Sequence, residues 1–320
     1  MQSSIEQFDT LRSGDATSKV DVRGYTQLLA DLIHVEPMNN IYIHGMKIRM
    51  KTQMRRQTTN VYGPDFSAVV TTIGGRPYQE DRCFNGQVRD DTDVVAVFDG
   101  HGGHSVAEHC VSVMPLAIAR VAASSESITV DGLSRAFSEV DRSATRALHV
   151  GSTACVVVFD RNNEQVWCAN TGDSRALLAS SGHAVPLSRD HKPENTDERR
   201  RIERQGGSVV HDGHCFRVQG VLNVSRVIGD WALRPYVTPL PEVARTDIHP
   251  GDSYILVASD GLWDVFSSEE AVMEVDAVLA SRATLPPSRL AESALRSLVA
   301  EARRRGSSDN ITVAIRGCAI

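Results

Sequence analysis

The stretch VVAVFDGHGGHSVAEHC, residues 94–110, is an apolar run that ends without a spacer on a carboxylate, a glycine and an imidazole. Residues 94–98 have the length and the β-branched content of a buried strand. Asp99, Gly100 and His101 follow directly, and the end of a rigid strand can hold such groups accurately for chemistry. A lone Asp-Gly pair is also a common turn, so the surrounding sequence must distinguish a turn from a site.

Similar short runs recur along the chain and predict further strands. They cover residues 68–73, 154–159, 165–170, 176–179, 254–258 and 311–315. Apolar residues at helical spacing predict a helix over residues 133–140. Capping patterns predict helix starts at Ser105, Asn195 and Ser267, each of which has a Glu three residues later. Because neighbouring strands mostly follow one another without a crossover helix, we expect an α+β fold of antiparallel sheets with helices packed outside.

Acidic residues form four clusters in the same setting: each lies where an apolar run meets a predicted turn. The clusters contain Glu80 with Asp81, Asp99, Asp260 with Asp264, and Asp309. Acidic residues beside buried strands are unfavourable unless they are exposed or paired with cations. If the strand ends converge, Glu80, Asp99, Asp260 and Asp309 form an all-oxygen cage, which Mg²⁺ or Mn²⁺ prefers and Zn²⁺ does not. One cluster could simply end a strand, but four in the same setting favour a metal site.

The composition of the 320-residue chain, 41% hydrophobic and 23% charged, is that of a globular protein. Its net charge of −6 argues against nucleic acid as a partner and suits metal cations. The six cysteines form no C-x-x-C pair, so we expect buried, reduced thiols. No window approaches the roughly 18 apolar residues that span a bilayer, and no signal-peptide core is visible. We therefore expect a cytoplasmic protein, with the nucleus as an alternative, no membrane insertion, and a monomer by default.

Residues 1–61 differ from the rest of the chain. They contain a helix-like apolar pattern at residues 25–35, a strand-like run at residues 41–43 and a basic segment at residues 47–56. We predict that they form a partly flexible N-terminal extension and that the main domain covers residues 62–320.

From about residue 66 to residue 315 the sequence resembles the metal-dependent Ser/Thr protein phosphatases of type 2C. The matching segments, in family order, are GGRPYQEDR, VFDGHGGH, GSTACVVV, ANTGDSRALL, LSRDHKP, RVQGVLNVSRVIGD, LVASDGLWDV and SSDNITVAI. The resemblance implies a four-layer α-β-β-α sandwich, with two antiparallel sheets between flanking helices, and a type 2C catalytic domain over residues 62–320. Gln79 and Asn223 depart from the family pattern, which usually has Met and Ala there, and residues 1–61 have no counterpart.

The resemblance also implies a ligand set for two Mg²⁺ or Mn²⁺ ions per domain. Asp99 would bridge the two ions. The Gly100 carbonyl and Glu80 would help to hold one of them, and Asp260 and Asp309 would hold the other.

Further roles follow from the same resemblance. Asp81 would orient the attacking water, as outer carboxylates of metal sites commonly do. Arg76 would clamp the phosphate, because a planar guanidinium matches phosphate oxygens in a bidentate way. His101 would be the general acid that protonates the leaving seryl or threonyl oxygen. Asp173 and Asp264 match positions that hold a weaker third ion in some relatives, and they could equally be turn and capping residues.

The implied activity is hydrolysis of phosphoserine and phosphothreonine in phosphorylated proteins, with two metal ions activating a water for in-line attack on phosphorus. The alternative is a pseudophosphatase that binds phosphoproteins without hydrolysing them. A cysteine-based phosphatase is excluded, because the His-Cys pairs at residues 109–110 and 214–215 lack the required Arg. In relatives a loop region corresponding to residues 193–226 covers the site, and its charges at residues 198–204 would ordinarily form a solvated helix face.

Overall fold

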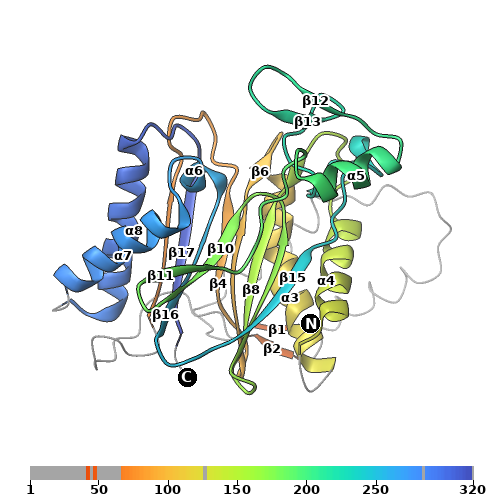
Figure 1. Ribbon diagram of the computed structural model, residues 1–320. Coiled ribbons are helices and arrows are strands. Elements are labelled where there is room, and N and C mark those ends of the chain that lie inside the picture. The colour runs from red at the N-terminus through yellow and green to blue at the C-terminus, as the bar shows by residue number, and fades with distance from the viewer. Residues whose placement is uncertain (1–40, 44–45, 49–65, 125–127, 283–284, 319–320) are drawn as a thin grey trace, which may run out of the picture. The chain divides into compact units, whose positions relative to one another are not determined.

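Two five-stranded antiparallel sheets pack face to face, and a pair of helices covers the outer face of each sheet (Figure 1). This computed structural model describes residues 41–43, 46–48, 66–124, 128–282 and 285–318. The predicted four-layer α-β-β-α sandwich is confirmed. The boundary proposed near residue 62 and the helix-like pattern at residues 25–35 lie outside the described residues.

The first sheet lies under the two C-terminal helices. Its strands, in spatial order, are β11 (His183–Pro186), β10 (Arg175–Ser180), β16 (Asp252–Ala258), β17 (Ile311–Gly317) and β3 (Ser67–Thr72). The covering helices are α7 (Ser268–Ser281) and α8 (Pro287–Arg304). Leu256 and Val313 of the sheet pack in one buried cluster with Val275 and Leu298 of these helices.

The second sheet lies under the two N-terminal helices. Its strands, in spatial order, are β15 (Glu242–Asp247), β9 (Gln165–Thr171), β8 (Ala154–Asp160), β5 (Thr92–Phe98) and β4 (Arg82–Arg89). The covering helices are α3 (Ser105–Ser124) and α4 (Val130–Ser143). Val94 and Phe98 face these helices, whereas Val95 and Val97 face the other sheet. Both faces of β5 are therefore buried, which explains its unbroken apolar run.

Smaller elements stand at one end of the sandwich (Figure 1). A three-stranded sheet contains β6 (Gly100–His101), β7 (Gly151–Ser152) and β14 (Ile228–Gly229). Residues 193–226, here called the flap, contain α5 (Thr196–Arg204), β12 (Val209–His211) and β13 (Phe216–Val218). The short helices η2 (Trp231–Leu233) and α6 (Asp260–Trp263) complete this end. β1 (Ile41–Ile43) and β2 (Met46–Ile48) pair separately, so the strand predicted at residues 41–43 is confirmed.

The helix-start predictions have three different outcomes. Ser267 forms the expected capping box with Glu270 at the start of α7. A helix does begin at Ser105, as predicted, but Ser105 is its first helical residue, and the Glu108 carboxylate accepts a hydrogen bond from Arg82 at 3.3 Å. Asn195 does stand at the N-cap of α5, but its side chain donates to the Asp190 carbonyl at 2.7 Å rather than capping the helix.

Two expectations drawn from composition need correction. All six cysteines are free, but Cys83, Cys215 and Cys318 are only partly buried. Among the described residues, α3 is long and apolar enough by composition to cross a membrane, although we expected no such segment. In the fold, Val106 and Met114 on this helix pack in the core beside the second sheet.

Candidate active site

The antiparallel topology brings the ends of several strands together at one end of the sandwich. In the second sheet, the register pairs Arg82 at the start of β4 with Phe98 at the end of β5. In the first sheet, it pairs Ile311 at the start of β17 with Thr72 at the end of β3. The predicted residues immediately flank these strand ends: Arg76, Glu80, Asp81, Asp99 and Asp309.

Hydrogen bonds tie the loops of the two sheets together at this end. The Ser259 hydroxyl, just after β16, donates to the Asp81 carboxylate at 2.8 Å and accepts from the Thr312 N–H at 3.0 Å. The Asn310 side chain accepts from the Glu80 N–H at 2.8 Å and donates to the Tyr78 carbonyl at 3.0 Å. Ser259 and Asn310 lie inside the recognised segments, but the sequence alone assigned them no role.

Asp99 is held through its backbone, which leaves its side chain for the site. Its N–H donates to the Thr153 hydroxyl at 3.0 Å, and its carbonyl accepts from the Thr153 N–H at 2.8 Å. The Asp99 carboxyl lies within hydrogen-bonding reach of Asp260 and Asp81. Burial, followed by the negative charge of Asp260, raises the pKa of Asp99 well above its usual value.

The pKa values of two neighbouring carboxyls are raised in the same way. Burial raises the pKa of Asp81 to about 6, and its Oδ1 atom has no hydrogen-bond partner. Burial, followed by repulsion from Asp173, raises the pKa of Asp260. The site therefore concentrates negative charge at buried and half-buried positions, where unpaired charge is costly.

The donor chemistry of this cluster fits a divalent cation. The donors are all oxygen, the charge of Asp260 opposes ionisation of Asp99, and one buried oxygen is unsatisfied. Within the described part of the chain, however, no three acidic, imidazole or thiol groups surround a single point. A protein cation also holds one predicted ligand, because Arg76 donates to Asp309 at 2.6 Å.

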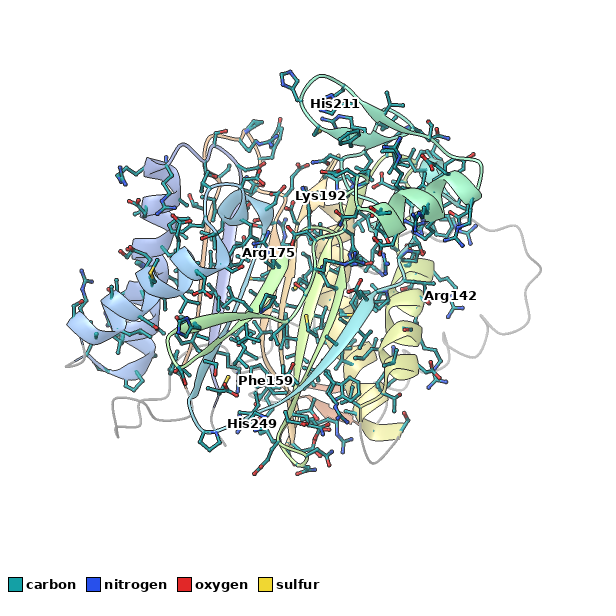
Figure 2. The ribbon with its side chains drawn as sticks, viewed as in Figure 1. Arg142, Phe159, Arg175, Lys192, His211 and His249 are labelled. Atoms are coloured by element: carbon teal, nitrogen blue, oxygen red, sulfur yellow. The ribbon has the colours of Figure 1, made fainter. Side chains whose placement is uncertain are left out.

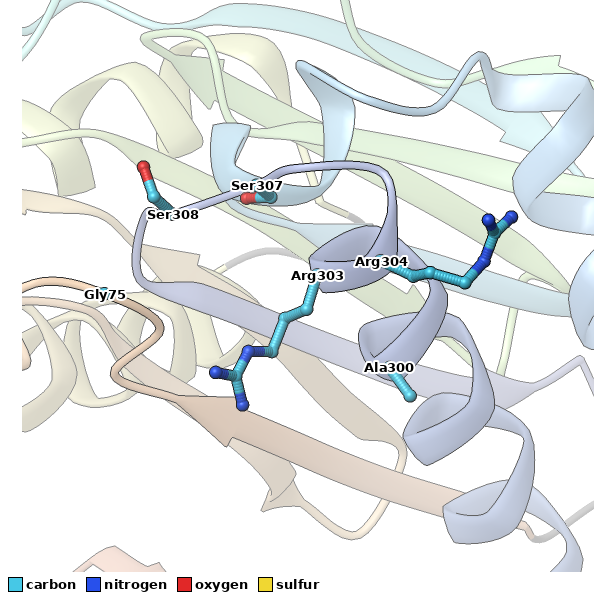
Figure 3. Close-up of a pocket in the computed structure, with 6 residues that line it drawn as sticks. All are labelled: Gly75, Ala300, Arg303, Arg304, Ser307 and Ser308. Carbon is cyan, nitrogen blue, oxygen red and sulfur yellow. The ribbon is translucent and has the colours of Figure 1, made fainter.

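Arg76 lies at the open side of the cluster. Its side chain is 57% exposed, and the hydrogen bond from Arg76 to Asp309 raises the pKa of its guanidinium. The preceding residue, Gly75, lines a pocket of about 490 Å³ together with Arg303 and Ser308, as Figure 3 shows. The exposed guanidinium is within reach of solvent.

Glu80 and Gly100 meet through their backbones. A Cβ atom at Gly100 would lie 2.6 Å from the Glu80 carbonyl oxygen, so this close approach requires glycine. Among the described residues, no hydrogen bond or ion pair joins the Glu80 carboxylate to the other predicted ligands. The structure thus brings Asp81, Asp99 and Asp260 into one cluster, whereas the metal-binding role of Glu80 stays a prediction.

His101 occupies β6, and its imidazole Nε2 pairs with the Asp230 carboxylate. The Asp230 side chain is almost fully buried, whereas that of His101 is 31% exposed. Sequence reasoning missed Asp230, although the residue closes the recognised segment RVQGVLNVSRVIGD.

Asp173 and Asp264, the predicted third-ion residues, lie beside Lys192. Lys192 forms an ion pair with Asp173, and this attraction raises the pKa of the ammonium group although burial acts in the opposite direction. In Figure 2, Lys192 lies toward the end of the sheets that faces the flap. A protein cation thus already compensates the charge of Asp173, and a third metal ion stays a prediction.

A buried carboxylate holds the flap together from within. Glu198 of α5 accepts hydrogen bonds from Arg226 at 2.6 Å, from the Ser225 hydroxyl at 2.6 Å and from Arg201 at 3.0 Å. Its side chain is 2% exposed. The interpretation of residues 198–204 as a solvated face is therefore wrong for Glu198, which joins α5 to the segment after β13.

Comparisons with known proteins give one consistent result. The family model for protein phosphatase 2C matches residues 73–311. A probable protein phosphatase 2C 71 of Arabidopsis thaliana is 40% identical over 224 residues, which are 68% of this chain and 47% of that protein. A probable protein phosphatase 2C 45 of Oryza sativa subsp. japonica is 40% identical over 225 residues, which are 68% of this chain and 74% of that protein. The chain spans between 47% and 62% of the length of three such relatives.

Solved structures agree with the sequence comparisons. A C. elegans sex determining protein superposes with a TM-score of 0.70 at 29% identity, covering 80% of this chain and 65% of the other. A serine-threonine phosphatase 2C from Toxoplasma gondii superposes with a TM-score of 0.67 at 24% identity, covering 80% of this chain and 95% of the other. The second likeness bears on the fold alone.

Proposed function

Because the chain belongs to the protein phosphatase 2C family, we propose that it is a metal-dependent phosphatase that hydrolyses phosphoserine and phosphothreonine in phosphorylated proteins. The observation that carries this proposal is the carboxyl cluster of buried Asp81 and half-buried Asp99 and Asp260, which adjoins the Arg76–Asp309 pair at one end of both sheets. The substrates are part of the proposal and not of the family assignment, because the chain spans only part of the length of several relatives.

Two Mg²⁺ or Mn²⁺ ions are the cofactors that we propose for this cluster. The residues that would hold them are Glu80, Asp99, Gly100 through its carbonyl, Asp260 and Asp309. When bound, such ions neutralise developing charge and lower the pKa of water. The protein contributes a rigid arrangement of donors, since Asp99 is fixed by Thr153 and Asp81 by Ser259.

Arg76 and His101 act on the substrate in this proposal. The Arg76 guanidinium is exposed enough to exchange Asp309 for phosphate oxygens, which it can bind in a bidentate way. The His101 ring, in its doubly protonated imidazolium form, gives its Nδ1 proton to the seryl or threonyl oxygen as the bond to phosphorus breaks. Because Nε2 pairs with the Asp230 carboxylate, Nδ1 is the ring nitrogen left to act on the substrate.

Peptide specificity tests this function. Phosphate release would be measured from matched phosphoserine, phosphothreonine and phosphotyrosine peptides in the presence of Mn²⁺. We expect turnover of the first two peptides and little of the third. Saturable binding of the phosphopeptides with no phosphate release in Mn²⁺ or Mg²⁺ would instead support the pseudophosphatase alternative.

The structure also allows a test that distinguishes the metal-dependent mechanism from a cysteine-based one. Burial raises the pKa of the Cys110 thiol far above its usual value, so this group is not a ready nucleophile. Thiol-alkylating reagents should therefore leave turnover unchanged under conditions in which the protein stays folded. Loss of activity that follows alkylation of Cys110 would contradict the metal-dependent mechanism.

A further inference from the structure

We propose that Asp230 is a positioning residue for His101, and that its buried carboxylate holds the imidazole in the one orientation that delivers a proton to the leaving group. This inference rests on the proposed function and deepens it. It assigns a task to a residue that lies 129 positions away from His101 in the sequence.

The pairing has the chemical form of an orienting contact. The Asp230 carboxylate lies at the Nε2 atom of His101, and its side chain is 3% exposed. A buried carboxylate bonded to one ring nitrogen fixes the tautomer and the rotation of an imidazole, which leaves the second nitrogen in a defined direction. His101 is itself partly exposed, so a substrate can reach the other side of its ring.

The three-stranded sheet explains how the two residues meet. Strand β6 pairs His101 with Gly151 of β7, and β7 pairs Gly151 with Gly229 of β14. Asp230 directly follows Gly229, and its N–H donates to the Val150 carbonyl at 3.0 Å. The register therefore places Asp230 across β7 from His101.

Two backbone features are adapted to this contact. Asp230 has φ of 48° and ψ of 53°, a left-handed conformation that is uncommon for any residue but glycine and is tolerated best by Asn and Asp. A Cβ atom at Gly151 would lie 2.7 Å from His101 Nε2, so the strand between the two residues must carry glycine. Such unusual conformations persist only where the surrounding structure enforces them, and they concentrate at functional sites.

The neighbouring cation Arg234 is attracted by both Asp141 and Asp230, but its hydrogen bonds go elsewhere. Arg234 donates to Asp141 at 2.6 Å and to the Gly229 carbonyl at 2.8 Å. Asp141 also accepts from the Gly229 N–H at 2.9 Å. Asp141 therefore stabilises this loop and its arginine, whereas the carboxylate of Asp230 is directed to His101.

Kinetics with two leaving groups test the inference. The alkoxide of a phosphothreonine peptide requires a proton as it leaves, whereas p-nitrophenolate does not. We expect His101→Gln to lower kcat on the peptide by about 10²- to 10⁴-fold with a much smaller effect on p-nitrophenyl phosphate. Asp230→Asn, which keeps the side-chain shape and tolerates the left-handed backbone, should show the same selectivity with a loss of about 10-fold or more.

Matched variants separate positioning from a general loss of structure. Asp141→Asn removes a buried carboxylate of α4 that holds the same loop without touching His101, so it should affect both substrates by a similar factor. Gly151→Ala keeps the Asp230 carboxylate but inserts a methyl group at the contact, and it should reproduce the selective loss. The double variant of His101→Gln and Asp230→Asn should be no worse than His101→Gln alone, because the two residues act as a unit.

A measurement on the metal-free protein checks the orientation without using activity. Long-range ¹H–¹⁵N spectra report which ring nitrogen of His101 carries the proton. We expect protonated Nε2 in one tautomer for the wild type, and a changed tautomer or mixed populations in Asp230→Asn. An unchanged His101 spectrum in a folded Asp230→Asn variant would overturn the inference.

The outcomes distinguish this inference from the proposed function. If His101→Gln loses both substrates equally, the general-acid role fails, and the spectra still decide whether Asp230 orients the ring. If His101→Gln is selective but Asp230→Asn leaves the ratio of the two kcat values at the wild-type level, only the positioning role of Asp230 is overturned.

Discussion

Asp99 combines a firmly held backbone with a carboxyl group whose charge is poorly tolerated without a cation. Thr153 fixes the main chain on both sides of the residue, while burial and Asp260 oppose ionisation of the side chain. Asp99→Asn keeps the shape of the side chain and removes its charge. We therefore expect the variant to fold, to be no less stable than the metal-free wild type, and to lose Mn²⁺ affinity by at least about 10-fold.

Calorimetric titration with Mn²⁺ and thermal unfolding with and without the ion measure these effects. The wild type should gain thermal stability on adding Mn²⁺, because a ligand that binds only the folded state stabilises it. The variant should gain much less. Equal Mn²⁺ affinity in the two proteins would remove Asp99 from the ligand set.

Arg76 differs from Asp99 because it competes for a predicted ligand rather than acting as one. Arg76→Gln should weaken inhibition by inorganic phosphate by about 10- to 100-fold, since charge-assisted hydrogen bonds are worth roughly 1.5 to 3 kcal/mol. Its Mn²⁺ affinity should not fall, because the change frees Asp309. Phosphate inhibition that is unchanged while Mn²⁺ affinity drops would reverse these assignments.

At the scale of elements, Glu198 holds the flap together, because it joins α5 to Ser225 and Arg226 at the end of the flap. Burial alone would raise the pKa of Glu198, but hydrogen bonds from Arg226 and Ser225 lower it to about 2. Because the folded-state pKa lies below the unfolded value, the stabilisation is complete above about pH 4.5 and is lost as the pH falls toward about 2. Glu198→Gln should therefore lower the local opening free energy of the flap at pH 7 by about 3 kcal/mol, the cost of breaking a buried pair.

Hydrogen exchange of the amides of α5 and β12 measures that opening. The difference between wild type and Glu198→Gln should shrink as the pH is lowered toward 3. Glu203→Gln is the control on the same helix, since its pair with Arg199 is exposed and should contribute less than about 1 kcal/mol. Equal protection of the flap in wild type and Glu198→Gln at pH 7 would show that this anchor is unimportant.

The sequence predicted central strands better than edge strands. The apolar runs that became β5, β8, β16 and β17 lie inside their sheets, where both faces are covered. The missed strands β4, β11 and β15 are all sheet edges, and their mixed polar sequences carry no continuous apolar signal. The strands β12 and β13 were missed because they are short and belong to the flap.

The sequence predicted those site residues that lie in recognisable segments beside strands. Asp81, Asp99 and Asp260 were identified in this way, and they do converge. The sequence did not identify Asp230 as the partner of His101 or Lys192 as the partner of Asp173. Both contacts are made by the three-dimensional fold and not by a local sequence pattern. No sequence spacing indicates that β7 places Asp230 opposite His101, or that the segment after β11 turns Lys192 onto Asp173.

At the scale of the whole molecule, every predicted catalytic residue lies after residue 61. We therefore expect deletion of residues 1–61 to leave kcat on p-nitrophenyl phosphate within about twofold of the full chain, since it removes no residue that is assigned to the chemistry. Far-ultraviolet circular dichroism and thermal unfolding of the shortened protein serve as the folding control. A folded but inactive product would show that the extension is part of the site and that the predicted boundary is wrong.

The central claim is that carboxylates from both sheets act together through bound metal ions. The most direct measurement is phosphate release from a phosphothreonine peptide by the full chain with Mn²⁺, after chelation with EDTA, and after Mn²⁺ is restored. Asp260→Asn is measured alongside under the same conditions. The account predicts loss of turnover in chelator, recovery with Mn²⁺, and a loss of about 10²-fold or more in the variant. Full turnover in excess chelator, or a wild-type rate for folded Asp260→Asn, would contradict it.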